Sequence, residues 1–331
     1  MLANYVVDAI VHGARSLFGE DAIDYPRLWY LYKDTTAQNI QYIPQLWGKG
    51  FSYTGTLDDD STVDRKDLNQ KIETKYFDKI IIPIHHNKYN HYQDMHSLLD
   101  YLLQYYTPAD IALVDSWDLP FFDATVSKRC TYFKRELLEK GVRHAHPIGG
   151  GWIPKEKYRS RIEKSVAFAP LVPASHLEVP NNIAHRNTYI YQDEESYYKQ
   201  YQESYFAYTC KKGGWDCMRH YEILASYTMP FFTDIEVCPT TCLVDYPKDL
   251  LSLAKHIKGV LPGMENPNYM GGCENIYPAE RRGSIAWDLF DSTTYETLLE
   301  EMIDYSYKTL NTEKMVESIL KNMGVAYGNF R

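Results

Sequence analysis

The chain of 331 residues lacks the features that would place it outside the ordinary globular proteins. No stretch approaches the length of a membrane span, and the N-terminus lacks the basic, apolar and small-residue regions of a signal peptide. None of the six cysteines forms a C-x-x-C pair, and Cys238 and Cys242 have no second pair of ligands at zinc-like spacing. We therefore expect reduced thiols, a cytoplasmic location, no membrane span and no obligatory metal.

An excess of positive charge is also missing, since the formal net charge is −9. A free-standing nucleic-acid binder normally carries a basic face, whereas basic residues here gather only in short clusters such as Lys211-Lys212. The sequence predicts no nucleic-acid partner. What is abundant is tyrosine, with 30 residues, whose ring can be buried while its hydroxyl stays hydrogen-bonded. Clefts rich in such rings suit the C–H faces of sugars.

The first half of the chain shows the rhythm of an α/β protein. Residues 4–17 have helical periodicity, and residues 80–84 and 111–114 are continuous apolar runs typical of buried parallel strands. A helical pattern over 95–106 separates them, which predicts a βαβ unit. Residues 131–140 are predicted as a helix or turn, and the glycine-rich stretch 146–152 as a connection between lobes.

The second half repeats this rhythm, so we predict two lobes, residues 1–160 and residues 161–331. The predicted order is helix, strand, turn, helix, strand and helix, followed by helices near the C-terminus. Their ranges are 194–204, 205–209, 211–216, 217–226, 229–233, 248–257 and 294–323.

The stretch 211–239 carries the most chemical information. A Gly213-Gly214 turn after a strand leads into a helix, whose N-terminal N–H groups and dipole suit a diphosphate. Lys211, Lys212 and Arg219 supply cations nearby. Further along, Glu222 lies on the same helix face as Arg219 and can accept from two ribose hydroxyls, while Asp234 follows the next strand. The plainer alternatives are a surface ion pair between Arg219 and Glu222 and a solvated loop at Lys211-Lys212.

The pattern Arg219-x-x-Glu222-x-x-Ala225-x-x-x-x-Pro230-Phe231, followed by Asp234, resembles the donor-site motif of exostosin-type and related GT-B glycosyltransferases. In that motif the glutamate typically holds the donor ribose and the basic residues hold the diphosphate. The segments 132–137, 146–148 and 48–55 also resemble parts of exostosin-like and family 1-like viral or bacterial transferases. The resemblance implies a GT-B fold of two Rossmann-like lobes, a UDP- or GDP-sugar donor and a carbohydrate acceptor.

Two departures from the family pattern bear on this reading. Tyr227 stands where the family motif has glycine, which would narrow the donor pocket if Tyr227 lines it. The first strand expected of the N-terminal lobe is also missing or displaced, because the chain starts directly with a helical pattern. Both departures favour an alternative in which the protein binds carbohydrate on a transferase fold without catalysing transfer.

Candidates for a catalytic base follow the two strands of the first lobe. His86 has a suitable unperturbed pKa, and Asp115 ends the second strand. A further alternative is a metal-dependent GT-A enzyme, in which Asp115 and Asp118 hold a divalent cation under the nucleotide. Their spacing is D-x-x-D rather than the usual D-x-D, and the donor-like motif lies late in the chain, so we favour GT-B.

Overall fold

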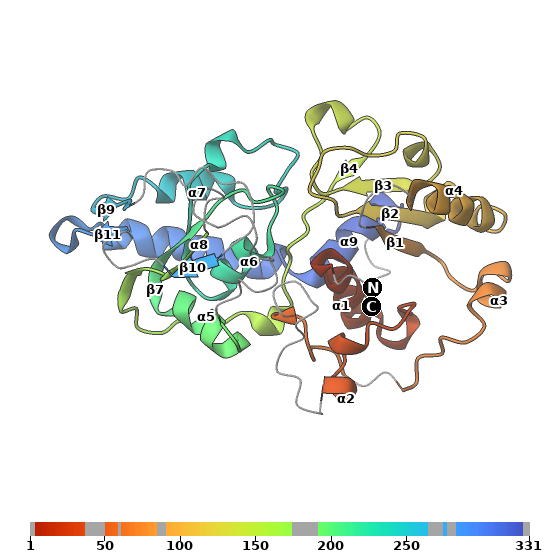
Figure 1. The fold of residues 1–331 in the computed structure, drawn as a ribbon, viewed down its shortest axis with the longest axis horizontal. Coiled ribbons are helices and arrows are strands. Elements are labelled where there is room, and N and C mark those ends of the chain that lie inside the picture. The colour runs from red at the N-terminus through yellow and green to blue at the C-terminus, as the bar shows by residue number, and fades with distance from the viewer. Residues whose placement is uncertain are drawn as a thin grey trace, which may run out of the picture.

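The computed structural model describes residues 4–36, 50–58, 61–84, 91–173, 191–263, 274–276 and 283–326. Two parallel β-sheets occupy the two halves of the molecule, one built from strands β1 to β4 and the other around β7 (Figure 1). Helices pack against both sheets. The α/β class predicted from the sequence is therefore confirmed.

The first sheet contains four parallel strands that follow one another in chain order. The predicted βαβ unit is present, with α4 over His91–Leu102 between the first two strands. Asp115 at the end of β2 lies beside Lys134 at the end of β3 in the register of the sheet. The strands are β1 (Ile80–Ile84), β2 (Ile111–Asp115), β3 (Thr131–Lys134) and β4 (His146–Pro147).

Strand β2 is buried on both faces of this sheet. Ile111 and Leu113 pack with α4 on one face, whereas Ala112 and Val114 join the larger core on the other. That second face is covered by α1 (Tyr5–Phe18) and α9 (Thr312–Asn322). The edge strand β1 is only half-buried along its length, so the expectation of full burial is wrong for it. An edge strand has a neighbour on one side only.

The helix or turn predicted over residues 131–140 is wrong at its start, where the structure has strand β3. Phe133 and Tyr132 are buried on opposite faces of the sheet, as alternation in a strand requires. The three residues after Tyr132 and Phe133, namely Lys134, Arg135 and Glu136, thereby come to lie at the carboxyl end of a central strand, and all three are buried.

The second sheet contains β5 (Val166–Phe168), β7 (Ser204–Thr209) and β8 (Met229–Phe232), all parallel. The helices, strands and turn predicted between residues 194 and 257 are confirmed. Aromatic side chains fill its core, where the Phe168 ring stacks on those of Phe206 and Tyr208. The helices of this half are α5 (Glu194–Gln202), α6 (Met218–Ala225), α7 (Lys248–Ala254) and α8 (Ser292–Thr309).

Shorter elements complete the described chain. Strand β6 (Leu171–Pro173) pairs antiparallel with β10 (Glu274–Ile276), and β9 (Val260–Leu261) pairs antiparallel with β11 (Ser284–Ile285). Two short helices, α2 (Lys33–Thr36) and α3 (Leu68–Glu73), precede the first sheet. In the part of the chain that the structure describes, no helix combines the length and apolar character needed to cross a membrane.

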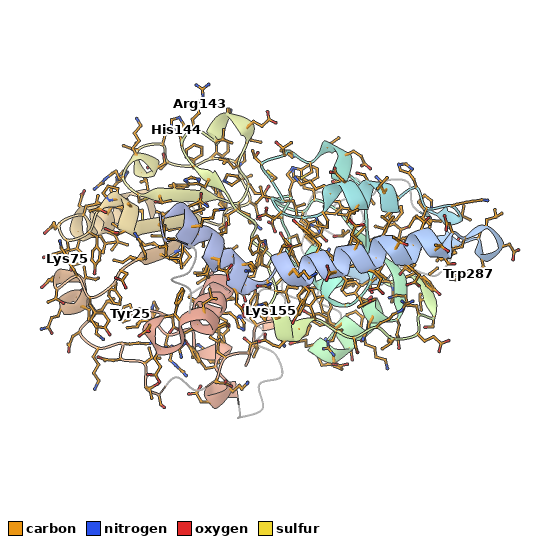
Figure 2. All side chains as sticks on the ribbon, turned by 180° about the vertical axis from the view of Figure 1, so that it is seen from behind. Tyr25, Lys75, Arg143, His144, Lys155 and Trp287 are labelled. Atoms are coloured by element: carbon orange, nitrogen blue, oxygen red, sulfur yellow. The ribbon has the colours of Figure 1, made fainter. Side chains whose placement is uncertain are left out.

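The last two helices join the halves of the molecule. From behind, α8 runs along the second half and α9 continues onto the first, with Lys155 labelled near their junction (Figure 2). Helix α9 packs closely on α1, where His12 Nδ1 lies 2.8 Å from Thr312 Oγ1. Gly13 on α1 allows this approach, because a side chain there would collide with the carbonyl of Thr312. Residues near both ends of the chain therefore cover the same face of the first sheet.

Replacing Gly13 by alanine tests this contact. Helix propensity alone favours alanine by about 0.5–1 kcal/mol, but the collision with the Thr312 carbonyl should dominate. We expect the free energy of unfolding in urea to fall by about 2 kcal/mol, as for other overpacked sites. The control Ser16→Ala, on the exposed face of α1, should stay within about 0.5 kcal/mol of wild type. A stabilised Gly13→Ala protein would contradict the described packing of α9.

Candidate functional site

The carboxyl ends of the two parallel sheets meet at the turn that follows β7. Arg135 and Glu136 follow β3, and the turn residue Asp216 lies against both. The backbone N–H of Asp216 donates to Glu136 Oε1 at 2.9 Å, and Arg135 Nη1 donates to the Asp216 carbonyl at 2.6 Å. The N–H of Gly150, after β4, donates to Asp216 Oδ2 at 2.8 Å. In α/β sheets ligands bind outside the carboxyl ends of the strands, so this junction is the candidate site.

The two glycines of the predicted diphosphate turn face carboxylates of the first half. A Cβ atom added to Gly214 would collide with the carboxylate of Glu136, and one added to Gly213 would collide with that of Asp118. Neither glycine has a positive φ, so close approach rather than backbone conformation accounts for them. The groups that lie against the turn in this arrangement are thus the protein's own carboxylates, and the predicted diphosphate site stays a prediction.

Arg135 is the main cation at this junction and is buried. Besides the Asp216 carbonyl, its guanidinium contacts the Tyr5 hydroxyl and the Asp118 carboxylate. The Arg135 guanidinium thus contacts one carboxylate, that of Asp118, and interacts electrostatically with those of Glu136 and Asp216. Burial raises the pKa of Asp216 to about 6; Arg135 opposes this shift and Glu136 adds to it. Among the described residues no hydrogen-bond partner reaches Asp216 Oδ1.

The predicted phosphate-binding cations lie at the carboxyl end of the second sheet. Lys211 and Lys212 are half-buried, whereas Arg219 on α6 is buried. Asp234, after β8, accepts from the Lys211 backbone N–H at 3.2 Å and so ties the ends of β7 and β8 together. Burial raises the pKa of the Asp234 carboxyl. These four predicted residues are thus brought to one edge of the sheet.

Each carboxylate oxygen of Glu222, the predicted ribose ligand, accepts from a protein hydroxyl. Ser52 Oγ donates to its Oε1 at 2.8 Å, and Tyr197 OH donates to its Oε2 at 2.6 Å. Glu222 and Arg219 are both buried, so the alternative of a surface ion pair is wrong. Glu222 accepts from two hydroxyls, but both belong to the protein, and its role as a ribose ligand stays a prediction.

Asp115 does not reach a substrate in this arrangement. Its carboxylate is fully buried and forms an ion pair with Lys134 Nζ at 3.0 Å, while Tyr132 OH donates to its Oδ2 at 2.7 Å. Asp118 is paired with a different cation, Arg135. Because each carboxylate already has its own buried cation, the pair does not fit the cation site of the GT-A alternative. No cluster of His, Cys, Asp and Glu suited to a metal occurs among the described residues.

Two further predictions concern His86 and Tyr227. His86 lies outside the described residues. Tyr227 has a φ of 59°, a left-handed conformation that favours glycine. The family motif has glycine at this position, which suits the same backbone conformation. Tyr227 precedes β8 and therefore lies at the edge of the sheet opposite Lys211 and Lys212, where its hydroxyl bonds Glu300 on α8. It does not narrow the candidate site.

Sequence reasoning missed Arg135 and Glu136 because it did not place them after a strand. The available signal was the run Thr131-Tyr132-Phe133 ending abruptly in charged residues, the same pattern that predicted the ends of β1 and β2. The sequence also identified Asp216 only as a residue of the predicted turn 211–216. The contacts of Asp216 with Arg135, Glu136 and Gly150 cross 66 to 81 residues of chain, and no local pattern announces them.

Comparisons of this chain with family models, curated proteins and solved structures gave no match. The described geometry and the motif resemblance are therefore the grounds for a function.

The pKa of Asp216 predicts a pH dependence of stability. The folded protein holds this proton to about pH 6, whereas the ordinary carboxyl value is 3.8. The stabilisation from this group is fully present below pH 3.8 and is lost as the pH rises through 6. The free energy of unfolding of wild type, relative to Asp216→Asn, should fall by about 3 kcal/mol between those limits.

Urea denaturation at a series of pH values measures this difference. Asp288→Asn, at an exposed carboxylate of the second half, is the control and should follow the wild-type curve. Parallel curves for wild type and Asp216→Asn would show that the Asp216 carboxyl titrates at its ordinary pKa.

Proposed function

We propose that this protein is a glycosyltransferase of the GT-B kind that transfers a sugar from a UDP- or GDP-sugar to a carbohydrate acceptor. The observation that carries the proposal is the meeting of two parallel-sheet carboxyl ends, one of which bears Lys211, Lys212 and Arg219. In α/β proteins this is the position of ligand sites, and the cations match the double negative charge of a leaving nucleoside diphosphate. The motif resemblance around Arg219 and Glu222 supports the same conclusion.

The proposed roles follow from the contacts. Lys211 and Lys212 are half-buried and would bind the diphosphate together with Arg219, while Asp234 fixes the backbone of Lys211. Glu222 would fix α6 through Ser52 and Tyr197 unless the donor ribose replaces one of those hydroxyls. Catalysis would rest on positioning and on stabilising the leaving diphosphate with fixed cations. Of the two bases proposed from the sequence, Asp115 is occupied by Lys134, and His86 stays a prediction.

The carboxylates at the glycine turn require an addition to this mechanism. Glu136 accepts the Asp216 N–H, which is the type of group that binds phosphate at a helix N-terminus. A diphosphate at the turn would meet the like charges of Glu136 and Asp118. We infer that donor binding moves these two carboxylates away from the turn.

Thermal shift with a panel of nucleotides tests the donor site. A nucleotide at 100 times its Kd should stabilise the protein by about 2.7 kcal/mol, and UDP or GDP should do so where the other nucleotides do not. The double variant Lys211→Ala/Lys212→Ala should lose at least about tenfold in affinity, equivalent to 1.4 kcal/mol. The control Lys199→Ala/Lys308→Ala removes two exposed lysines of the same half, each in an i,i+4 ion pair.

The control should keep the full nucleotide response. If no nucleotide stabilises the wild-type protein, the transferase proposal is wrong and the non-catalytic carbohydrate-binding alternative is favoured. Equal nucleotide responses of the two double variants would instead show that Lys211 and Lys212 do not bind the nucleotide.

Removing the charge of Glu136 tests the proposed displacement of this carboxylate. Glu136→Gln keeps an oxygen acceptor for the Asp216 N–H but removes the repulsion of a bound diphosphate. We expect UDP or GDP, whichever binds, to bind about tenfold more tightly by calorimetry, a gain of about 1.4 kcal/mol. The control Glu139→Gln changes an exposed residue of the same loop and should leave the affinity unchanged. An unchanged affinity in Glu136→Gln would mean that the donor binds away from the turn.

A further inference from the structure

The ion pair between Asp115 and Lys134 is fully buried, with both side chains at 0% exposure. Burial of two charges costs much of what their attraction returns, and such pairs often contribute little net stability. Burial lowers the pKa of Lys134, while Asp115 opposes that shift. Stability alone therefore gives a poor account of this pair, and its hydrogen bonds show another role.

Both members of the pair hold the main chain of Trp117. The Trp117 N–H donates to Asp115 Oδ1 at 3.0 Å, and Lys134 Nζ donates to the Trp117 carbonyl at 2.9 Å. The Ser116 N–H donates in turn to the carbonyl of Ile84 at 3.0 Å. The loop that leaves β2 is thus fixed at successive residues before it reaches the surface.

The loop then presents aromatic rings beside a carboxylate. Trp117 is half-buried and Phe121 is 64% exposed, with ring centroids 6.3 Å apart. Leu119 between them is 43% exposed. The Asp118 side chain is 46% exposed and faces Gly213 of the second half. Proteins recognise a sugar ring with such groups: partly exposed aromatic rings on a fixed loop, beside a carboxylate that can accept hydrogen bonds from the sugar hydroxyls.

We propose that Trp117, Phe121 and Asp118 form the subsite for a pyranose ring of the acceptor. The Trp117 ring would stack on its C–H face, the Phe121 ring, tilted by 47° to it, would contact its edge, and Asp118 would accept from its hydroxyls. Asp115 and Lys134 are positioning residues that act through the Trp117 backbone. This inference rests on the proposed function, since it places the acceptor beside the Gly213-Gly214 turn. The negative charge of Asp118 favours a neutral sugar over a phosphorylated ligand at this subsite.

The direct test is ¹⁹F NMR of protein labelled with 5-fluorotryptophan and titrated with methyl glycosides of glucose, galactose, mannose, xylose and N-acetylglucosamine. Trp117→Phe assigns the Trp117 resonance. We expect that resonance to shift saturably with at least one glycoside, and Phe121→Ala to weaken its binding about five- to tenfold. Trp287, 56% exposed at the far end of the second half (Figure 2), is the matched control and should not respond.

A Trp117 resonance that ignores every glycoside overturns the subsite. If the nucleotides still stabilise the protein in that case, the transferase proposal stands without it. A Trp117 resonance that moves with protein concentration instead would identify the rings as a contact between copies of this chain, which also overturns the subsite. A response to glycosides without any response to nucleotides would support the subsite and contradict the transferase.

The positioning role is tested by removing both charges together, because removing one leaves the other buried and unpaired. Asp115→Asn/Lys134→Met should fold with nearly the wild-type melting temperature. We expect its glycoside affinity to fall about fivefold and the Trp117 resonance to broaden, while the nucleotide response is kept. Wild-type affinity and line width in this variant would show that the pair has no positioning role.

Discussion

The arrangement of the two halves depends on Asp216, a residue of the second half that three residues of the first half bind. Its N–H, its carbonyl and its carboxylate are each bound by a different residue that follows a strand of the first sheet. Arg135 and Glu136 are adjacent in sequence after β3. The carboxyl end of this one strand therefore binds both the carbonyl and the N–H of Asp216. The glycines before Asp216 are needed for the same reason, since any side chain at Gly214 would separate the halves. The position of the candidate site follows from this contact.

Tyrosine hydroxyls donate to several buried carboxylates of the protein. Tyr30 donates to Asp8, Tyr197 donates to Glu222, and Tyr221 donates to Asp216. Burial raises the pKa of Asp8 to about 7, and the bond from Tyr30 opposes this shift. A phenol buries a large ring and still supplies one donor, so tyrosine can fill a core and neutralise part of the cost of a buried carboxylate. This gives a structural reason for part of the tyrosine excess of the sequence.

The sequence was informative where local patterns suffice and silent where distant segments meet. The apolar run 80–84 identified β1, and residues 211–226 were predicted correctly as a turn and a helix, because length, glycines and periodicity all agree there. The run 131–133 was too short to separate a strand from a helix, so the residues of β3 that face Asp216 were missed. The predicted cations at 211, 212 and 219 do lie at one sheet edge. No local pattern could show that Glu136 already occupies the turn beside them, or that Lys134 already neutralises Asp115.

The proposed donor and acceptor subsites share one cation. Arg135 binds the Asp118 carboxylate, beside the aromatic loop, and the Asp216 carbonyl, in the glycine turn. If a diphosphate displaces Glu136 and Asp118 from the turn, Arg135 loses its contact with Asp118. The loop that carries Trp117 is then no longer held at Asp118. Thermodynamic linkage then requires the reverse effect as well: an acceptor that holds Asp118 on the loop changes the affinity for the donor by the same factor. In the proposed mechanism the shared arginine would therefore couple the two subsites without movement of either sheet.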